Sequence, residues 1–80
     1  MSKEDKRLIL GTITEKKEDL AALEIKIERY RQDVTQYLRE WMPVDEIRPE
    51  LAKSALDELI VTWNKRRELL AEIKRLKEEL

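Results

Sequence analysis

The segment WMPVDEIRPE, residues 41–50, decides the fold, because it holds both prolines of the chain. Pro43 has no amide proton and disfavours the helical conformation at the residue before it, so a helix that arrives from the N-terminal side must stop there. Pro49 suits the first turn of a new helix. Between the prolines, Asp45 suits the cap of a single helical turn. The sequence therefore predicts a first helix over about residues 3–42, a linker over residues 43–48 and a second helix over about residues 49–80.

On the N-terminal side of this segment, apolar residues recur at alternating steps of four and three. This is the spacing of a coiled-coil seam, and only Lys16 interrupts it. The first half of the predicted core seam consists of Ile13, Leu20, Leu23, Ile27, Tyr30, Val34, Tyr37 and Trp41.

The second helix repeats the spacing, with Arg66 and Lys77 at two seam positions. All four aromatic residues of the chain then lie on the seam, which favours a packed core over an exposed stacking platform. The second half of the predicted core seam consists of Leu56, Leu59, Trp63, Leu70 and Ile73, with Ala52 and Leu80 at the ends of the same pattern.

Two long helices joined by a few residues must run antiparallel, so the fold class is all-α, an antiparallel two-helix coiled-coil hairpin forming a single domain. Folding about the linker centre pairs residues whose numbers sum to about 92. This pairing predicts Trp41 opposite Ala52, Tyr30 opposite Trp63, and Arg66 between Glu24 and Glu28.

Several apolar residues fall outside this pairing, at the N-terminal end and beside the seam. We expect them to form a contact surface, and a second copy of the hairpin would cover it in a dimeric four-helix bundle. The heptad step across Gly11 favours one continuous first helix, although a separate N-terminal segment stays open as an alternative. The candidate interaction surface consists of Leu8, Ile9, Leu10, Leu38, Ile60, Leu69 and Leu76.

The composition restricts the chemistry. The chain has no Cys and no His, which excludes disulfides, thiolate chemistry and the Glu-x-x-His sites of four-helix di-iron proteins. We therefore expect no catalytic residues, no cofactor, no metal site and no small-molecule substrate. No apolar run is long enough to span a bilayer and no secretory signal is evident, so a cytoplasmic protein without membrane contact is expected.

These observations favour a non-catalytic helical hairpin that acts as a protein–protein interaction module: an adaptor, a regulator or an assembly piece. Its expected partners are a second copy and an unidentified protein. An alternative is an accessory protein that touches nucleic acid through the basic residues between Lys65 and Lys77, although acidic neighbours weaken that patch. A third reading is a small all-helical enzyme with an inter-subunit pocket lined by Arg66.

Overall fold

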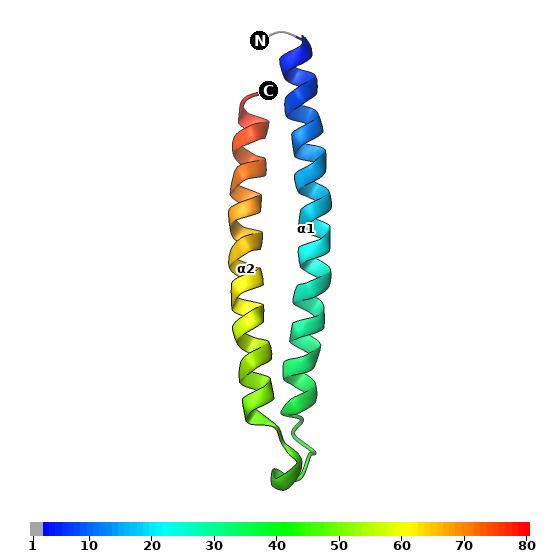
Figure 1. The fold of residues 1–80 in the computed structure, drawn as a ribbon, viewed down its shortest axis with the longest axis vertical. Helices are drawn as coiled ribbons and strands as arrows, with labels where there is room; N and C mark the ends of the chain where they lie inside the picture. The colour runs from blue at the N-terminus through cyan, green and yellow to red at the C-terminus, as the bar shows by residue number, and fades with distance from the viewer. Residues whose placement is uncertain (1–2) are drawn as a thin grey trace.

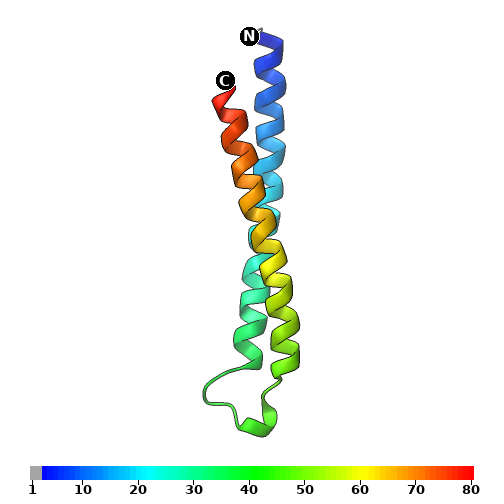
Figure 2. The ribbon, with the colours of Figure 1, turned by 90° about the vertical axis from the view of Figure 1, so that its left-hand side faces the viewer.

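The computed structural model of the chain describes residues 3–80 and consists of two long helices and a short connection. Helix α1 runs over Lys3–Tyr37, the 3-10 turn η1 over Val44–Glu46, and helix α2 over Pro49–Glu78. The two helices lie side by side and antiparallel, and α1 extends past the end of α2 (Figure 1). The molecule measures 64 × 15 × 14 Å along its principal axes, and the helices cross over one another along their length (Figure 2). The prediction of an all-helical hairpin is confirmed.

Both helices begin as the sequence indicates. Glu4 and Asp5 occupy the first turn of α1, where carboxylates favour the positive end of the helix dipole. Pro49 occupies the first turn of α2, and the backbone N–H of Ala52 donates to the carbonyl of Arg48 at 3.0 Å. Helix α1 continues through Gly11 without a break, so the expected continuity of the N-terminal segment is confirmed.

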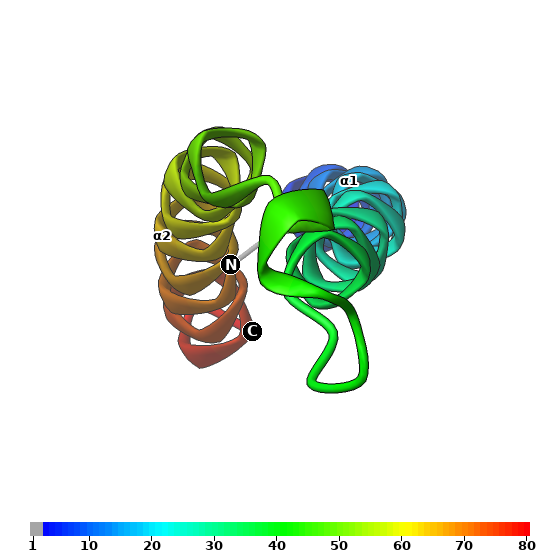
Figure 3. The same ribbon diagram turned by 90° about the horizontal axis from the view of Figure 1, so that it is seen from below.

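The end of α1 differs from the expectation, because the helix stops at Tyr37 and not near Met42. The carbonyl of Tyr37 accepts a hydrogen bond from the backbone N–H of Arg48 at 3.1 Å, so it is satisfied by the far side of the connection. Trp41 therefore lies in the connection and is 72% exposed, which makes its assignment to the core seam wrong. Figure 3 views the molecule from this end, with the connection in front of α1.

The pairing of the two helices explains why α1 stops early. Lys16 contacts Glu72, and Glu24 contacts Arg66, so paired numbers sum to 88 and 90, slightly below the expected sum of about 92. At this register the partner of Trp41 would lie between Ile47 and Pro49, at or before the first residue of α2. A longer α1 would gain no packing from α2, and the chain turns instead.

The expected capping of the connection is also wrong in detail. A helical turn does form at Val44–Glu46, but Asp45 lies inside it, and Pro43 occupies the cap position without a side-chain hydrogen bond. The side chain of Arg48 donates to the carbonyls of Asp45, Glu46 and Ile47 at 3.1–3.3 Å. Arg48 thus holds the connection together.

On α1 the predicted seam is correct up to Tyr37. Ile13 is buried, and the remaining predicted seam residues of α1 are half-buried. These half-buried residues are Leu20, Leu23, Ile27, Tyr30, Val34 and Tyr37.

On α2 the seam follows a different set of positions from the predicted one. Leu59 and Ile73 lie in it as predicted, but Leu56, Trp63 and Leu70 are exposed. The residues one position earlier take their places in the interface. The α2 seam consists of Ala52, Ala55, Leu59, Thr62, Arg66, Leu69, Ile73 and Leu76, all buried or half-buried.

Side-chain size gives a physical reason for the α2 seam. Ala52, Ala55 and Thr62 are small, so α2 can approach the larger leucine and tyrosine side chains of α1, as large-against-small packing requires. The hydroxyl of Thr62 donates to the carbonyl of Glu58 at 2.7 Å, which satisfies the buried polar atom within its own helix.

Candidate interaction groove

The seven residues predicted as an interaction surface divide into two groups. Leu8, Leu10, Leu38 and Ile60 are exposed, whereas Ile9, Leu69 and Leu76 are half-buried. Leu69 and Leu76 belong to the α2 seam, so their assignment to the outer surface is wrong. The predicted surface is therefore not one patch, and Ile60 is its member nearest the middle of α2.

Three further apolar side chains of α2 share the side of the helix on which Ile60 lies. Leu56, Trp63 and Leu70 recur at every seventh position of α2, immediately outside the seam, and Ile60 lies one turn from Leu56 and from Trp63. The four side chains are 37–50% exposed. We call Leu56, Ile60, Trp63 and Leu70 the outer row. It is the set of side chains that the sequence-based register placed mostly in the core.

Beside the outer row, the surface between the two helices is hollowed. One hollow of about 480 Å³ combines Ile27 and Arg31 of α1 with four residues of α2, and a second of about 300 Å³ adjoins it. Ile27 and Trp63 line both, so the two hollows are neighbours. The first is lined by Ile27, Arg31, Leu59, Ile60, Trp63 and Asn64, and the second by Glu24, Ile27, Glu28, Trp63 and Arg66. We call the two neighbouring hollows together the groove.

Trp63 lies at the centre of the groove. The guanidinium of Arg67 stands 5.2 Å from the centre of its ring, within the range of a cation–π contact. Such a contact at an exposed site contributes about 0.5–1 kcal/mol and keeps the positive charge beside the apolar surface. A ligand of the groove would meet apolar carbon and this guanidinium together.

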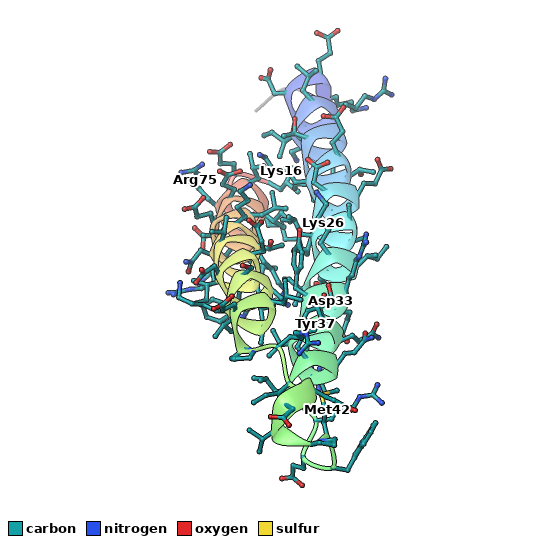
Figure 4. The ribbon with its side chains drawn as sticks, turned by 60° about the horizontal axis from the view of Figure 1, so that its bottom comes forward. Lys16, Lys26, Asp33, Tyr37, Met42 and Arg75 are labelled. Carbon is teal, nitrogen blue, oxygen red and sulfur yellow. The ribbon has the colours of Figure 1, made fainter. Side chains whose placement is uncertain are left out.

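Two ion pairs link the helices through the charged seam residues Lys16 and Arg66. Lys16 Nζ lies 2.6 Å from Glu72 Oε2, and Arg66 Nε lies 3.3 Å from Glu24 Oε1. The expected placement of Arg66 beside Glu24 is confirmed. Figure 4 labels Lys16 on α1, toward the open end of the hairpin, and Met42 in the connection at the other end.

The contact with Lys16 changes the acidity of Glu72. The Lys16 ammonium donates a hydrogen bond to the carboxylate and attracts its negative charge, which lowers the pKa of Glu72 from its ordinary value of 4.5. Partial desolvation opposes this effect, and Arg75 adds a smaller attraction. Lys16 and Glu72 therefore remain a charged pair at neutral pH.

The basic residues between Lys65 and Lys77 do not form one surface. Arg66 points into the seam and pairs with Glu24, and Arg67 covers Trp63. Lys65 instead lines a hollow of about 410 Å³ on the other side of the hairpin. That hollow is lined by Asp19, Ala22, Leu23, Lys26, Lys65, Glu68, Leu69 and Glu72. The run is thus distributed around α2, and six of the eight residues that line this hollow are acidic or apolar.

Within residues 3–80, no group of three or more acidic side chains is arranged to hold a metal ion. No helix in the same range is both long and apolar enough to cross a bilayer. Arg66, which the enzyme hypothesis places in a pocket, pairs with Glu24 on the opposite helix.

The signal that would have located the groove lies in the last two turns of α2. The predicted seam continued from Leu70 to Lys77, whereas the observed seam continues from Leu69 to Leu76. Burying a lysine side chain at a seam position costs more free energy than burying a leucine, so this comparison favours the observed seam. The size of Trp63 favoured the predicted seam instead, because large apolar side chains are usually core residues.

Comparison with known proteins adds no relative: no protein-family model, curated protein or solved structure significantly matches this chain.

Proposed function

We propose that the chain is a non-catalytic protein–protein interaction module, a helical hairpin that binds a further helical segment along the groove. In this role it acts as an adaptor, a regulator or an assembly piece. The observation that supports the proposal is the outer row, four large apolar side chains that are 37–50% exposed beside an open groove. Single exposed leucines are ordinary, but a contiguous apolar patch is typical of an interaction site.

The small core of the hairpin supports the same conclusion. Among residues 3–80, those buried are Ile13, Ala52, Ala55, Thr62 and Ile73, and three of these five side chains are small. Covering the outer row would add apolar burial at about 25 cal/mol per Å² of surface removed from water. A helix bound along the groove would therefore also stabilise the hairpin.

Homodimerisation remains a prediction of this account. A second hairpin side by side with the first would supply two covering helices in a four-helix bundle. Light scattering after gel filtration at low micromolar concentration measures it, and a dimer requires twice the 9.6 kDa chain mass.

The proposed function is tested by affinity capture with matched variants. The wild-type chain, Ile60→Glu and Val44→Glu are immobilised and exposed to an extract of the cells that make the protein. Val44 is exposed in the connection, away from the groove, so its variant controls for the added charge. We expect the same protein to be retained by the wild type and by Val44→Glu but lost with Ile60→Glu. Retention that is equal for all three chains, or absent for all three, would contradict the proposal.

A further inference from the structure

Helix α2 carries two overlapping seam patterns, and the structure uses one of them. Both patterns follow coiled-coil spacing and share a residue at every seventh position. The shared residues are Ala52, Leu59, Arg66 and Ile73. The observed seam adds the residues three positions after the shared ones, Ala55, Thr62, Leu69 and Leu76. The alternative seam adds the residues four positions after them, Leu56, Trp63, Leu70 and Lys77.

Helix α1 has no such second pattern. The residues that flank its seam between Ile13 and Val34 are Lys17, Glu24 and Arg31 on one side and Asp19, Lys26 and Asp33 on the other. All six are charged, so a turn of α1 about its axis would force charged side chains into the interface. Helix α1 is therefore one fixed surface, and α2 is the helix that has two faces to pack against it.

A rotation of α2 about its own axis exchanges the two seams. The shared residues stay at the interface, and the turn required is about 50°, half of the rotation between successive residues of an α-helix. The backbone before α2 permits such a turn, because Ile47 is extended, with φ -64° and ψ 151°, and does not continue the helix. Helix α2 can therefore change its face without unfolding.

The structure has room for the rotation on the Trp63 side. The hollow of about 480 Å³ is lined by Ile27 of α1 and by Trp63 of α2, and the rotation turns the indole ring toward Ile27. Thr62 turns outward at the same time. Its hydroxyl donates to the carbonyl of Glu58 within the same helix, so Thr62 leaves the seam without losing its hydrogen bond. Neither movement leaves a polar group unsatisfied.

The exchange of side chains has opposing effects at the two ends of α2. Toward the connection, the alternative seam has Leu56 and Trp63 where the observed seam has alanine and threonine, so it buries more apolar surface. Toward the open end, it has Lys77 in place of Leu76, which brings a charge into the interface. The two packing arrangements therefore differ by a small balance of large terms.

The ion pair between Lys16 and Glu72 favours the observed arrangement. Glu72 precedes the shared residue Ile73 on the side of α2 opposite to Trp63, and its Oε2 lies 2.6 Å from Lys16 Nζ. The rotation that turns Trp63 toward α1 turns Glu72 away from it. The pair thus forms in the observed arrangement and is lost in the rotated one.

We infer that α2 has a second, minor packing arrangement, rotated by about 50°, in which Leu56, Trp63 and Leu70 contact α1. In this arrangement the chain itself covers most of the outer row. A helix bound along the groove would select the observed arrangement and compete with the rotation. That consequence rests on the proposed function, whereas the rotation itself needs no partner.

The test uses the fluorescence of Trp63 in the Trp41→Phe variant, where it is the only tryptophan. In this parent, Leu76→Lys with Lys77→Leu exchanges two neighbouring residues without altering the composition. The exchange places the lysine in the observed seam and the leucine in the alternative one, which favours the rotated arrangement. We expect the emission to move to shorter wavelength and the rate constant for quenching by acrylamide to fall by about twofold or more.

Three further variants of the same parent serve as controls, and circular dichroism measures the helical content of each. Lys77→Leu alone keeps every residue of the observed seam and should give a smaller shift in the same direction, so it replaces the exchange variant if that variant loses helix. Leu56→Lys added to Lys77→Leu places a charge in the alternative seam and should restore the parent's quenching. Lys74→Leu adds a leucine outside both seams and should leave the quenching unchanged.

Several outcomes would overturn the inference. These are unchanged quenching in the exchange variant and in Lys77→Leu, a shift that Leu56→Lys does not reverse, and an equal shift with Lys74→Leu. A shift that grows with protein concentration would mean that a second copy covers Trp63, which also overturns it. If capture of a cellular partner depends on Ile60 but the quenching never changes, the proposed function stands and the rotation does not. The reverse result would leave the rotation without the proposed function.

Discussion

At the scale of single residues, Ile73 and Ile25 show how much the environment of one side chain type differs within this hairpin. Ile73 is 5% exposed in the seam, whereas Ile25 is 72% exposed on the outer side of α1. We expect Ile73→Ala to reduce the free energy of unfolding by about 2–4 kcal/mol, through lost burial and a cavity. Ile25→Ala, the matched control, should change it by less than about 0.5 kcal/mol. Urea unfolding measures both, and equal losses would mean that the seam is misplaced.

The ion pair between Lys16 and Glu72 makes stability depend on pH. Because the folded-state pKa of Glu72 is lowered, the contribution of the pair is present above the ordinary value of 4.5 and is lost as the pH falls through the lowered pKa. In Lys16→Met we expect the carboxyl pKa of Glu72 to rise, which carboxyl NMR measures directly. A pKa that is the same in the variant and the wild type would show that the pair does not persist in solution.

At the scale of the elements, Gly11 limits the stability of α1. It lies within the helix, and a Cβ added to it would meet no atom within 4 Å. We therefore expect Gly11→Ala to stabilise the protein, by up to about 1 kcal/mol. Thermal unfolding measures the gain, and Ala22→Gly at an exposed position of the same helix should give a loss. A loss from Gly11→Ala would show that another surface packs against this position.

The early end of α1 gives a second prediction at this scale. Proline inside a helix removes a hydrogen bond and clashes with the preceding turn, at a cost of about 3 kcal/mol or more. Gln32 lies within α1, whereas Glu40 lies in the connection. Gln32→Pro should therefore lower the melting temperature much more than Glu40→Pro. If the two variants lose equal stability, the helix continues to Met42, as the position of Pro43 first suggested.

At the scale of the whole molecule, the hairpin could be predicted from the sequence because two prolines and a long heptad pattern agree on it. The α1 seam followed for the same reason, since its apolar residues recur at alternating steps of four and three with only Lys16 interrupting them. The α2 seam did not, because two heptad patterns share Ala52, Leu59 and Ile73 and differ only at the positions between them. Packing against α1 selects the smaller side chains at residues 55 and 62, and within α2 only the choice between Leu76 and Lys77 indicates the same seam.

The groove was missed as a consequence of the same ambiguity. When Leu56, Trp63 and Leu70 are assigned to the core, the surface that remains consists of scattered residues. Their placement outside the seam leaves the outer row exposed beside the groove, and this arrangement supports the proposed function. The central claim of the account is therefore that the α2 seam passes through Ala55 and Thr62, with Leu56 and Trp63 outside it.

Thiol labelling of single-cysteine variants tests this claim most directly, because the chain has no cysteine of its own. Cysteine is introduced at Ala55, Leu56, Thr62 or Trp63, and the rate of reaction with a thiol reagent is measured on the dilute folded protein. We predict slow labelling at positions 55 and 62, where the side chains are buried, and fast labelling at 56 and 63. Fast labelling at 55 and 62, with protection at 56 and 63, would contradict the account.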